Sequence, residues 1–432
     1  MKDPRLILQT ALGVRPEERS AVLLSSFLFT LLMSGYYILR PLREEMGLAG
    51  GVDNLPRLFL VTMGAMVLAA PLFGYLVRRF PRDVCVPVAY RFFALNILVF
   101  YLCLSLAGDS ALVTMGRVFY VWVSVFNLFV VSLFWAFMAG GFGYGRSGRL
   151  FGIVAVGGTL GGIVGSGLTT LLVDLVGRHN LLLISLLFLE GAARLVPILA
   201  RRFAAMGPPL AENPDASATA DAAAGGGILG GIRLAFGSTY LAAVSAYLFL
   251  YSLTSTFLYF AQADIVAANV ATREARTAIF AAMDFWTNLL TLGGQLLLTG
   301  RLLRRLGTGP VLALLPLVTA VGFLVLGASP TLAVLVVFRV VRSASNYALA
   351  KPARETLFTV VDRNVRYKAK SFIDTFVYRA GDALGAGVSG WLAAAGLGLT
   401  PVAAAAVPVA GVWAAVSFYL GRRQRGLARR AE

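Results

Sequence analysis

Apolar segments of about twenty residues recur along almost the whole chain, and they constrain the fold more than any motif does. A helix needs about 20 apolar residues to cross the hydrocarbon of a bilayer. Such segments lie at residues 20–40, 56–77, 84–107, 112–140, 149–176, 181–200, 239–262, 277–300, 310–328, 331–350, 369–396 and 400–421. Only 14% of the 432 residues are charged, against about 25% in soluble domains. We therefore expect an all-α integral membrane protein with twelve transmembrane helices.

Basic residues are distributed unevenly between the predicted loops. The formal net charge is +17, and most of the 38 Lys and Arg lie in the N-terminal tail, the even-numbered loops and the C-terminal tail. Because cytoplasmic loops carry an excess of Lys and Arg, the pattern predicts a multi-pass protein of a bacterial inner (plasma) membrane with both termini cytoplasmic. The same distribution argues against a nucleic-acid partner. The alternative is that the C-terminal GRRQRGLARR stretch binds RNA or anionic lipid, and of these two partners lipid is favoured.

The predicted helices fall into two sets of six with a repeated motif. The Pro-, Ala- and Gly-rich stretch MGPPLAENPDASATADAAAGGG separates the sets, and GYLVRRFPR from Gly74 matches GRLLRRLGT from Gly300 at the same place in each. Parallel six-helix repeats joined by a long inner loop are the architecture of major facilitator transporters, whose signature loop this motif resembles. We expect two bundles of that type, with this division: an N-terminal tail at 1–19, a bundle at 20–200, a linker at 201–238, a second bundle at 239–421 and a basic tail at 422–432.

The residues that usually support metal or enzyme chemistry are sparse. The two cysteines, Cys85 and Cys103, lie eighteen residues apart on one predicted helix, and the only histidine, His179, lies in a short loop. No His/Cys cluster has the spacing of a metal site, and no base–nucleophile pair is visible. The sequence therefore predicts a protein that binds no cofactor and no metal and that is not an enzyme.

A glycine run occupies the fifth predicted helix. Gly157, Gly161 and Gly165 lie four residues apart and share one helix face. Small residues at this spacing allow close approach of a neighbouring helix. The run indicates either static packing or a face on which helices slide.

Charged residues inside the predicted spans are more often basic than acidic. Charge at mid-membrane costs at least about 2.5–3.5 kcal/mol per residue on insertion scales, so such groups are usually paired or face water. The arginines are Arg91, Arg117, Arg194, Arg339, Arg342 and Arg379; the acids are Glu190, Asp284, Asp374 and Asp382. The excess of arginine predicts an anionic ligand.

Some of these charges have a structural explanation. Glu190 and Arg194 are spaced to pair on one helix face, and Arg91 and Arg117 are close enough to helix ends to reach the headgroups. Arg339 and Arg379 lie deeper, which favours a central cavity. We expect Asp382 to hold Arg379 in the absence of substrate, and Asp284 to be a partner or a proton or ion site.

In a major facilitator architecture the first, fourth, seventh and tenth helices line the cavity. They offer Tyr36, Tyr37, Arg40, Asn127, Trp135, Tyr251, Tyr259, Gln262, Arg339, Asn346 and Tyr347. Guanidinium groups bind phosphate or carboxylate in a bidentate manner, and aromatic faces stack on bases. The alternative is that the aromatic residues, Tyr36 and Tyr37 above all, belong to an interfacial belt.

Three blocks of sequence resemble the ATP/ADP translocases of plastids and intracellular bacteria. YYILRPLRE is similar to the end of that family's first helix, with Arg43 and Glu44 at its basic–acidic pair. FWAFMAGGFGYGRSGRLFGIVAVGG resembles its helix 4–5 junction at Arg149, Phe151 and Gly152. The segment Lys351–Gly385 is similar to its helix 10–11 loop; the matching residues are Pro352, Arg354, Glu355, Lys368, Lys370, Ile373, Asp374 and Arg379. Arginine stands at 43 and 354 where the family has lysine, and Ala139–Gly141 replace a polar helix end.

The resemblance and the arginine excess together predict a transporter for an anionic, nucleotide-like or otherwise phosphorylated metabolite. We expect a monomer in which Arg40, Arg43, Arg339, Arg354 and Arg379 neutralise the substrate in turn during alternating access. Exchange is favoured because reorienting an empty basic cavity is costly. Two alternatives remain open: proton-coupled efflux of amphipathic molecules, with Asp284 or Asp374 titrating, and a nucleotide-binding membrane sensor that does not transport.

Overall fold

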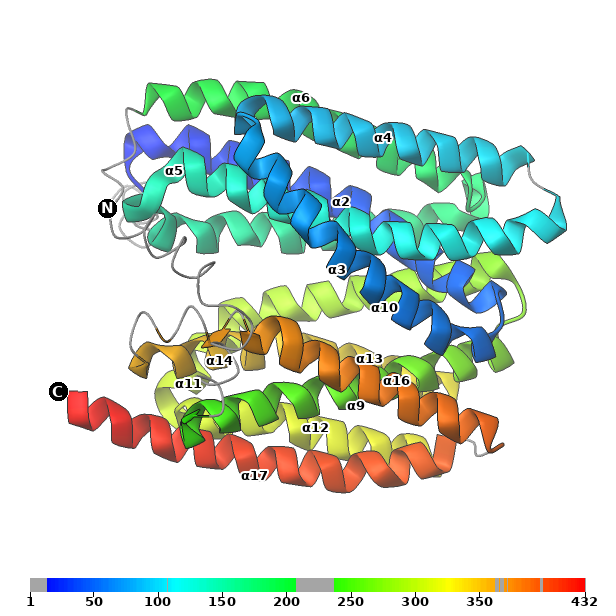
Figure 1. Cartoon of the computed structure of the whole chain (residues 1–432), viewed down its shortest axis with the longest axis vertical. Coiled ribbons are helices and arrows are strands. Elements are labelled where there is room, and N and C mark those ends of the chain that lie inside the picture. The colour runs from blue at the N-terminus through cyan, green and yellow to red at the C-terminus, as the bar shows by residue number, and fades with distance from the viewer. Residues whose placement is uncertain are drawn as a thin grey trace, which may run out of the picture. The chain divides into compact units, whose positions relative to one another are not determined.

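A computed structural model describes residues 14–106, 108–206, 237–361, 365, 369–370, 372–396 and 399–431, and among them every regular element is helical (Figure 1). The first half contains η1 (Pro16–Glu18), α2 (Arg19–Ala49), η2 (Val52–Asn54), α3 (Leu55–Arg79), α4 (Arg82–Leu106), α5 (Asp109–Val176) and α6 (Asn180–Ala205). The second contains α9 (Thr239–Asn269), α10 (Arg273–Gly294), η3 (Gln295–Thr299), α11 (Gly300–Leu306), α12 (Thr308–Ala328), α13 (Leu332–Ser345), η4 (Asn346–Ala350), α14 (Lys351–Leu357), η5 (Phe358–Val360), η6 (Ile373–Val377), α16 (Tyr378–Ala394) and α17 (Leu399–Ala431). The predicted N-terminal tail and linker lie mostly outside the described residues, as does Lys368.

Ten helical segments within the described part of the chain are long and apolar enough to cross a membrane. The two other predicted spans are helical as well. In the first of them, residues 277–299 fall on α10 and η3, where Asp284 and Asn288 reduce the apolar character; in the second, residues 373–394 fall on η6 and α16. The all-helical class and the bundle architecture predicted from the sequence are confirmed.

The first helix is longer than the sequence pattern indicated. We expected Arg40 to close it, but α2 continues through Pro41 to Ala49. Leu42 and Met46 in this extension are buried, and its charged residues Arg43 and Glu45 have partners inside the fold. One face of the extension is buried and the charged residues on it form ion pairs, which explains why the helix continues beyond Arg40.

The fourth and fifth predicted spans meet at a single glycine. Helical structure runs through α5 without a loop, but Gly143 interrupts it with a φ of 68° and a ψ of 173°. Glycine enters this region of backbone space at no steric cost. The two spans that result, Ala111–Gly143 and Arg149–Val176, match the two predicted from the sequence.

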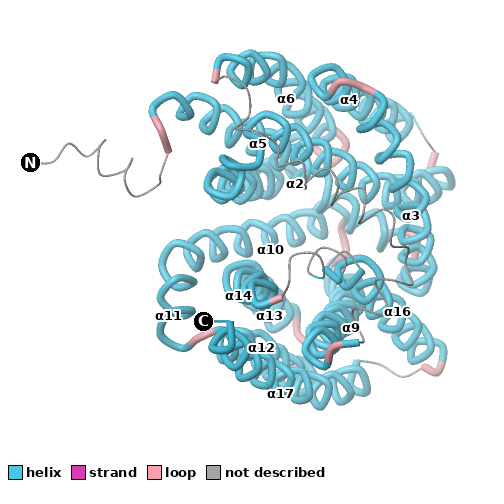
Figure 2. The backbone as a smooth tube through the Cα atoms, turned by 60° about the vertical axis from the view of Figure 1, so that its left-hand side comes forward, coloured by secondary structure: helices cyan, strands magenta, loops and turns pink. Residues whose placement is uncertain are grey.

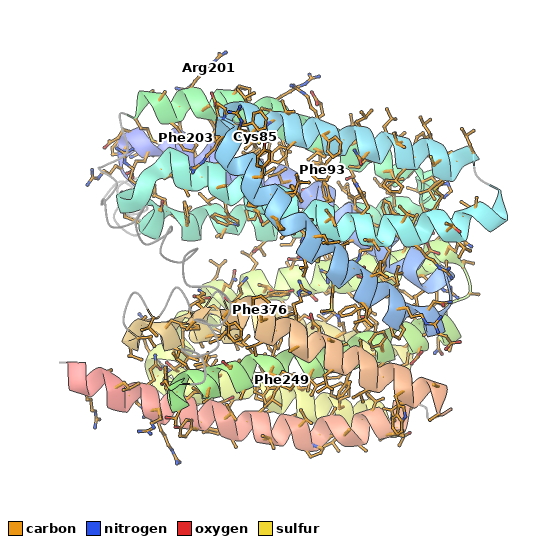
Figure 3. All side chains as sticks on the ribbon, in the orientation of Figure 1. Cys85, Phe93, Arg201, Phe203, Phe249 and Phe376 are labelled. Atoms are coloured by element: carbon orange, nitrogen blue, oxygen red, sulfur yellow. The ribbon has the colours of Figure 1, made fainter. Side chains whose placement is uncertain are left out.

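One compact unit consists of residues 1–51, 61–213 and 272–288. Its helix α2 packs against α5 and α6, and α4 packs against α6 (Figures 1 and 2). Phe93 on α4 and Phe203 on α6 belong to its hydrophobic core (Figure 3). Because residues 272–288 are the first part of α10, this helix of the second half contributes to a unit built mainly from the first.

The predicted glycine face makes a close seam between α2 and α5. A Cβ added to Gly157, Gly161 or Gly165 would overlap the backbone of Ser26, Thr30 or Ser34 on α2, one turn apart each time. Thr30 donates a hydrogen bond to the Gly157 carbonyl at 3.0 Å across the same seam. The structure therefore confirms that these glycines permit close helix packing.

The other compact unit consists of residues 52–60, 214–271 and 289–432. Within it α9 packs against α16 and α17, and α12 against α17. Tyr247 and Trp413 are fully buried in its core, with ring centroids 5.3 Å apart. Three five-residue π-helical turns, η3, η4 and η6, occur in this half of the chain, and π-helical turns are frequent at functional sites.

Candidate functional site

The first unit holds Arg40 against an acid. Its guanidinium lies 3.0 Å from the Asp284 carboxylate, and both side chains are largely buried. The Tyr37 ring lies 5.7 Å from the same guanidinium. The fold thus brings together three of the predicted site residues, and the expectation that Asp284 is a partner is confirmed.

Arg43 lies over an aromatic ring one turn further along α2. Its guanidinium is 4.2 Å from the centroid of Tyr120 on α5 and 3.2 Å from the carboxylate of Glu44. A cation over an aromatic face is attracted by the ring quadrupole. Arg43 is therefore held by one charged and one aromatic neighbour.

Asn127 and Trp135 have different environments on α5. Trp135 packs among aromatic side chains, with ring centroids 5.4 Å from Phe29 and 5.1 Å from Phe151. Asn127 is half-buried, and none of the hydrogen bonds between described residues involves its side chain. In this conformation Trp135 packs against the hydrophobic core.

Sequence reasoning missed an ion-pair cluster at the end of α2. Glu45 is fully buried and lies 3.1 Å from Arg178 and 3.7 Å from Arg273, while Arg178 also lies 3.8 Å from Glu274. His179 is adjacent, and burial together with the positive charges of Arg178 and Arg273 lowers its pKa. The only signal in the sequence was the second acid of the Glu44–Glu45 pair.

A second buried acid, Glu18, lies at the opposite end of α2. Arg149 donates two hydrogen bonds to it, at 2.8 and 3.0 Å, and the backbone N–H of Arg15 donates a third at 3.0 Å. Arg149 is one of the residues that match the translocase pattern. Its contact in this structure is a bidentate ion pair within the protein.

The second unit contains a polar seam between α9 and α13. We use this name for Tyr251, Thr254, Ser255 and Gln262 on α9 with Arg339, Arg342, Ser343 and Asn346 on α13 and the start of η4. Arg339 donates to the Gln262 amide oxygen at 3.1 Å and to the Ser343 hydroxyl. Asn346 donates to the Tyr251 hydroxyl at 2.9 Å. Three predicted site residues, Gln262, Arg339 and Asn346, therefore share this seam.

Arg342 is the most deeply buried arginine of the seam, with 4% of its surface exposed. Its Nε donates to Thr319 on α12 at 3.0 Å, and its Nη2 donates to Thr254 at 3.1 Å and Ser255 at 3.0 Å. The Tyr251 ring centroid lies 5.5 Å from the guanidinium. All of these partners are uncharged.

The π-helical turn η4 begins at Asn346, and a neighbouring turn satisfies its freed carbonyls. Thr299 of η3 donates to the Ala348 carbonyl at 2.6 Å, and Gln295 donates to the Tyr347 carbonyl at 3.4 Å. These bonds hold the irregular backbone that carries Asn346. Pro352 follows in α14 and has no N–H to donate to the Ala348 carbonyl four residues earlier, so that carbonyl is free to accept from Thr299.

Arg379 is paired on its own helix. Its Nη1 lies 3.2 Å from the Asp382 carboxylate, which also accepts hydrogen bonds from Ser252 and Thr256 on α9. The prediction that Asp382 holds Arg379 is confirmed. The predicted pair of Glu190 with Arg194 is confirmed as well, at 2.8 Å.

The remaining predicted residues of this unit do not join the seam. Tyr259 packs on Phe59 and Phe260, with ring centroids 5.9 and 5.5 Å away. Arg354 is half-buried and Asp374 is exposed, and neither makes a hydrogen bond or ion pair with another residue that the structure describes. Their place in a site stays a prediction.

Comparison with known proteins gives a result only at the level of the fold. No protein-family profile matches the chain, and no curated protein sequence matches it. Among solved structures, a bacterial homologue of the human lysosomal transporter Spinster, inward-facing and unoccupied, aligns with a TM-score of 0.55 and 15% identity over 96% of this chain and 99% of that one.

Two structures of a POT family transporter are also similar. One, in complex with a thioalcohol-conjugated peptide, aligns with a TM-score of 0.63 and 9% identity; the other, with 5-aminolevulinic acid, aligns with 0.60 and 11%. Each alignment covers 94% of this chain and 96% of the other. These neighbours do not test the resemblance to ATP/ADP translocases, which stays a prediction. The chain is thus a multi-pass membrane protein with the fold of major facilitator transporters.

Proposed function

We propose that the protein is a membrane transporter that carries a small anionic, phosphate-bearing metabolite, nucleotide-like in the reading that its sequence favours. The two six-helix halves would alternate access to a central site, with both termini in the cytoplasm of a bacterial cell. Transporters that share this fold supply the precedent for alternating access. The substrate class rests on the arginines.

The observation that carries the proposal is the environment of Arg339. It lies on α13, and its partners are the neutral side chains of Gln262 and Ser343. Among the described residues no carboxylate lies within ion-pair distance of it. A charge inside the membrane that lacks an acidic partner is costly, and an anionic substrate supplies the missing charge.

The ion pairs of other arginines are compatible with a transport cycle in which the substrate binds and is released. Arg40 with Asp284 and Arg379 with Asp382 are neutralised inside the protein, so they remain compensated when no substrate is bound. Arg43 and Arg354 would add further contacts as the substrate moves. Because Arg339 has no such partner, reorientation without an anion is disfavoured, which favours exchange of one anion for another.

Purified protein and proteoliposomes test this proposal in sequence. A panel of nucleotides and organic phosphates is screened for a rise in melting temperature, since a ligand that binds only the folded protein stabilises it. The best ligand is then loaded as a radiolabel and its flux measured. We expect Arg339→Gln to abolish both stabilisation and flux, and Arg194→Gln to preserve them, since the Arg194 side chain is 75% exposed.

Other outcomes select the alternative functions. Stabilisation by a nucleotide with no flux would select the sensor. Flux that follows an imposed pH gradient and is lost in Asp284→Asn would select proton coupling. Unchanged flux of the best phosphate ligand in Arg339→Gln would overturn the proposed role of that residue.

A further inference from the structure

The polar seam contains a second arginine that sequence reasoning did not place in the site. Arg342 lies three residues after Arg339 on α13, so the two side chains share a helix face with Cβ atoms about 5–6 Å apart. Asn346, four residues further, continues that face and reaches Tyr251. The two arginines are neighbours in one seam, on the side of α13 that meets α9.

No described residue neutralises either guanidinium of the seam. Within the described chain Arg342 has four side-chain or backbone oxygen acceptors, from Thr319, Tyr251, Thr254 and Ser255, and none is a carboxylate. Arg339 has two, from Gln262 and Ser343. Hydrogen bonds to neutral oxygens orient a guanidinium but leave its positive charge uncompensated.

Each guanidinium also has one nitrogen to which no described residue offers an acceptor. The acceptors of Arg342 engage Nε and Nη2, and those of Arg339 engage Nε and Nη1. No described residue accepts from Nη1 of Arg342 or from Nη2 of Arg339. Neither nitrogen is among the fully buried side-chain atoms that lack a partner, so each has some exposed surface.

From this arrangement we propose that Arg342 is a second anion-binding residue and that the seam selects a phosphoryl group carrying at least two negative charges. The inference rests on the proposed function and adds a charge requirement to it. A singly charged anion would neutralise only one of the two guanidinium groups of the seam. A phosphomonoester, which carries nearly two negative charges at pH 7, neutralises both and offers three oxygens to the free N–H groups.

A matched pair of probes separates charge from shape. Adenosine 5′-monophosphate and adenosine 5′-sulfate have the same tetrahedral head but about two charges and one charge respectively. Phenyl phosphate and phenyl sulfate repeat the comparison without a nucleoside. Binding is measured on full-length purified protein by ligand-dependent melting temperature and by titration calorimetry.

We expect wild-type protein to bind the phosphates more tightly than the sulfates by about tenfold, the factor for one charge-assisted hydrogen bond. In Arg342→Gln this preference should fall to about one, mainly through weaker phosphate binding. Arg342→Lys keeps the positive charge but loses the planar, bidentate donor geometry of the guanidinium, so it should retain part of the preference for phosphate.

Thr319→Val separates this role from a structural one. It removes the acceptor of Arg342 Nε without changing any charge, so it should lower the melting temperature of unliganded protein and leave the phosphate preference intact. Equal binding of phosphate and sulfate by wild-type protein, or an unchanged preference in Arg342→Gln, would overturn the inference while leaving anion transport standing. Binding of neither probe pair would overturn the proposed function together with the inference.

Discussion

Two sets of arginines, one in each compact unit, are held with different chemistry. In the first, Arg40 faces Asp284, and Arg178 and Arg273 face Glu45. In the second, the acceptors that described residues offer to Arg339 and Arg342 are hydroxyl, amide and carbonyl oxygens. In the first arrangement a carboxylate neutralises the positive charge of each arginine. In the second the arginines keep their positive charge.

Under the proposed function, this difference separates arginines that stabilise the fold from arginines that bind the anion. A buried ion pair is strongly destabilised by loss of one partner, because the other charge is left uncompensated. Removing a guanidinium that has no counter-charge eliminates a desolvated charge instead. Breaking an ion pair of the first unit should therefore lower stability more than ligand binding. Removing an arginine of the polar seam should weaken ligand binding more than it lowers stability.

The largest effect is expected at Glu45. Glu45→Gln leaves Arg178 and Arg273 without their buried carboxylate, so the free energy of unfolding should fall by about 3–5 kcal/mol. Chemical unfolding in mixed micelles measures this value. Glu190→Gln is the control: its arginine partners are more than half exposed, and the loss there should stay below about 1 kcal/mol. Similar losses in the two variants would contradict the distinction between buried and exposed pairs.

The glycine seam of the first unit should respond next. Gly161→Ala places a methyl group against the Thr30 carbonyl of α2, and overpacking of this kind costs about 1–3 kcal/mol. Gly152→Ala, on the same helix, meets nothing within 4 Å and should be neutral or slightly stabilising. Equal free energies of unfolding for the two alanine variants would contradict the close packing of α2 against α5.

Arg339→Gln should change stability less than either substitution above. Its guanidinium is bound by two neutral groups only, so the expected change in unfolding free energy is within about 1 kcal/mol. Anion-dependent stabilisation should nevertheless disappear. A fall as large as that of Glu45→Gln would mean that Arg339 is a structural residue and that the two units do not differ.

The smallest effect is expected from pH. The pKa of His179 is lowered in the folded protein, so the unfolded chain binds a proton more readily. Stability should therefore fall as pH drops below about 6.5, the ordinary histidine value, because charging His179 beside Arg178 and Arg273 is unfavourable. Melting curves of wild type and His179→Gln between pH 5 and 8 measure this, and the variant should lack that part of the pH dependence. An identical pH profile in both would assign the effect to other groups.

Particular residues show how far the sequence carried the prediction. The pairs Glu190–Arg194 and Arg379–Asp382 were predictable because the partners lie within one helical turn. The glycine face of α5 was predictable for the same reason, since its spacing is local. The continuation of α2 beyond Arg40 was not, because it depends on partners such as Arg178 that lie far along the chain.

The composition of the polar seam, the candidate site, was predicted only in part. Gln262, Arg339 and Asn346 were expected on cavity-lining helices and do share the seam. Arg342 was noted as a buried charge but not as a site residue, because its place depends on Thr319 from a third helix. Glu45 gave almost no sequence signal, since its carboxylate is compensated by residues more than a hundred positions away.

The sequence by itself determined that this protein is a helical membrane protein, because the requirement to satisfy backbone groups in lipid acts on each segment locally. Only the tertiary structure decided which charges are cancelled and which are left available. That decision depends on contacts between distant segments, such as Arg149 with Glu18 or Arg339 with Gln262, and no local pattern specifies which side chains will meet.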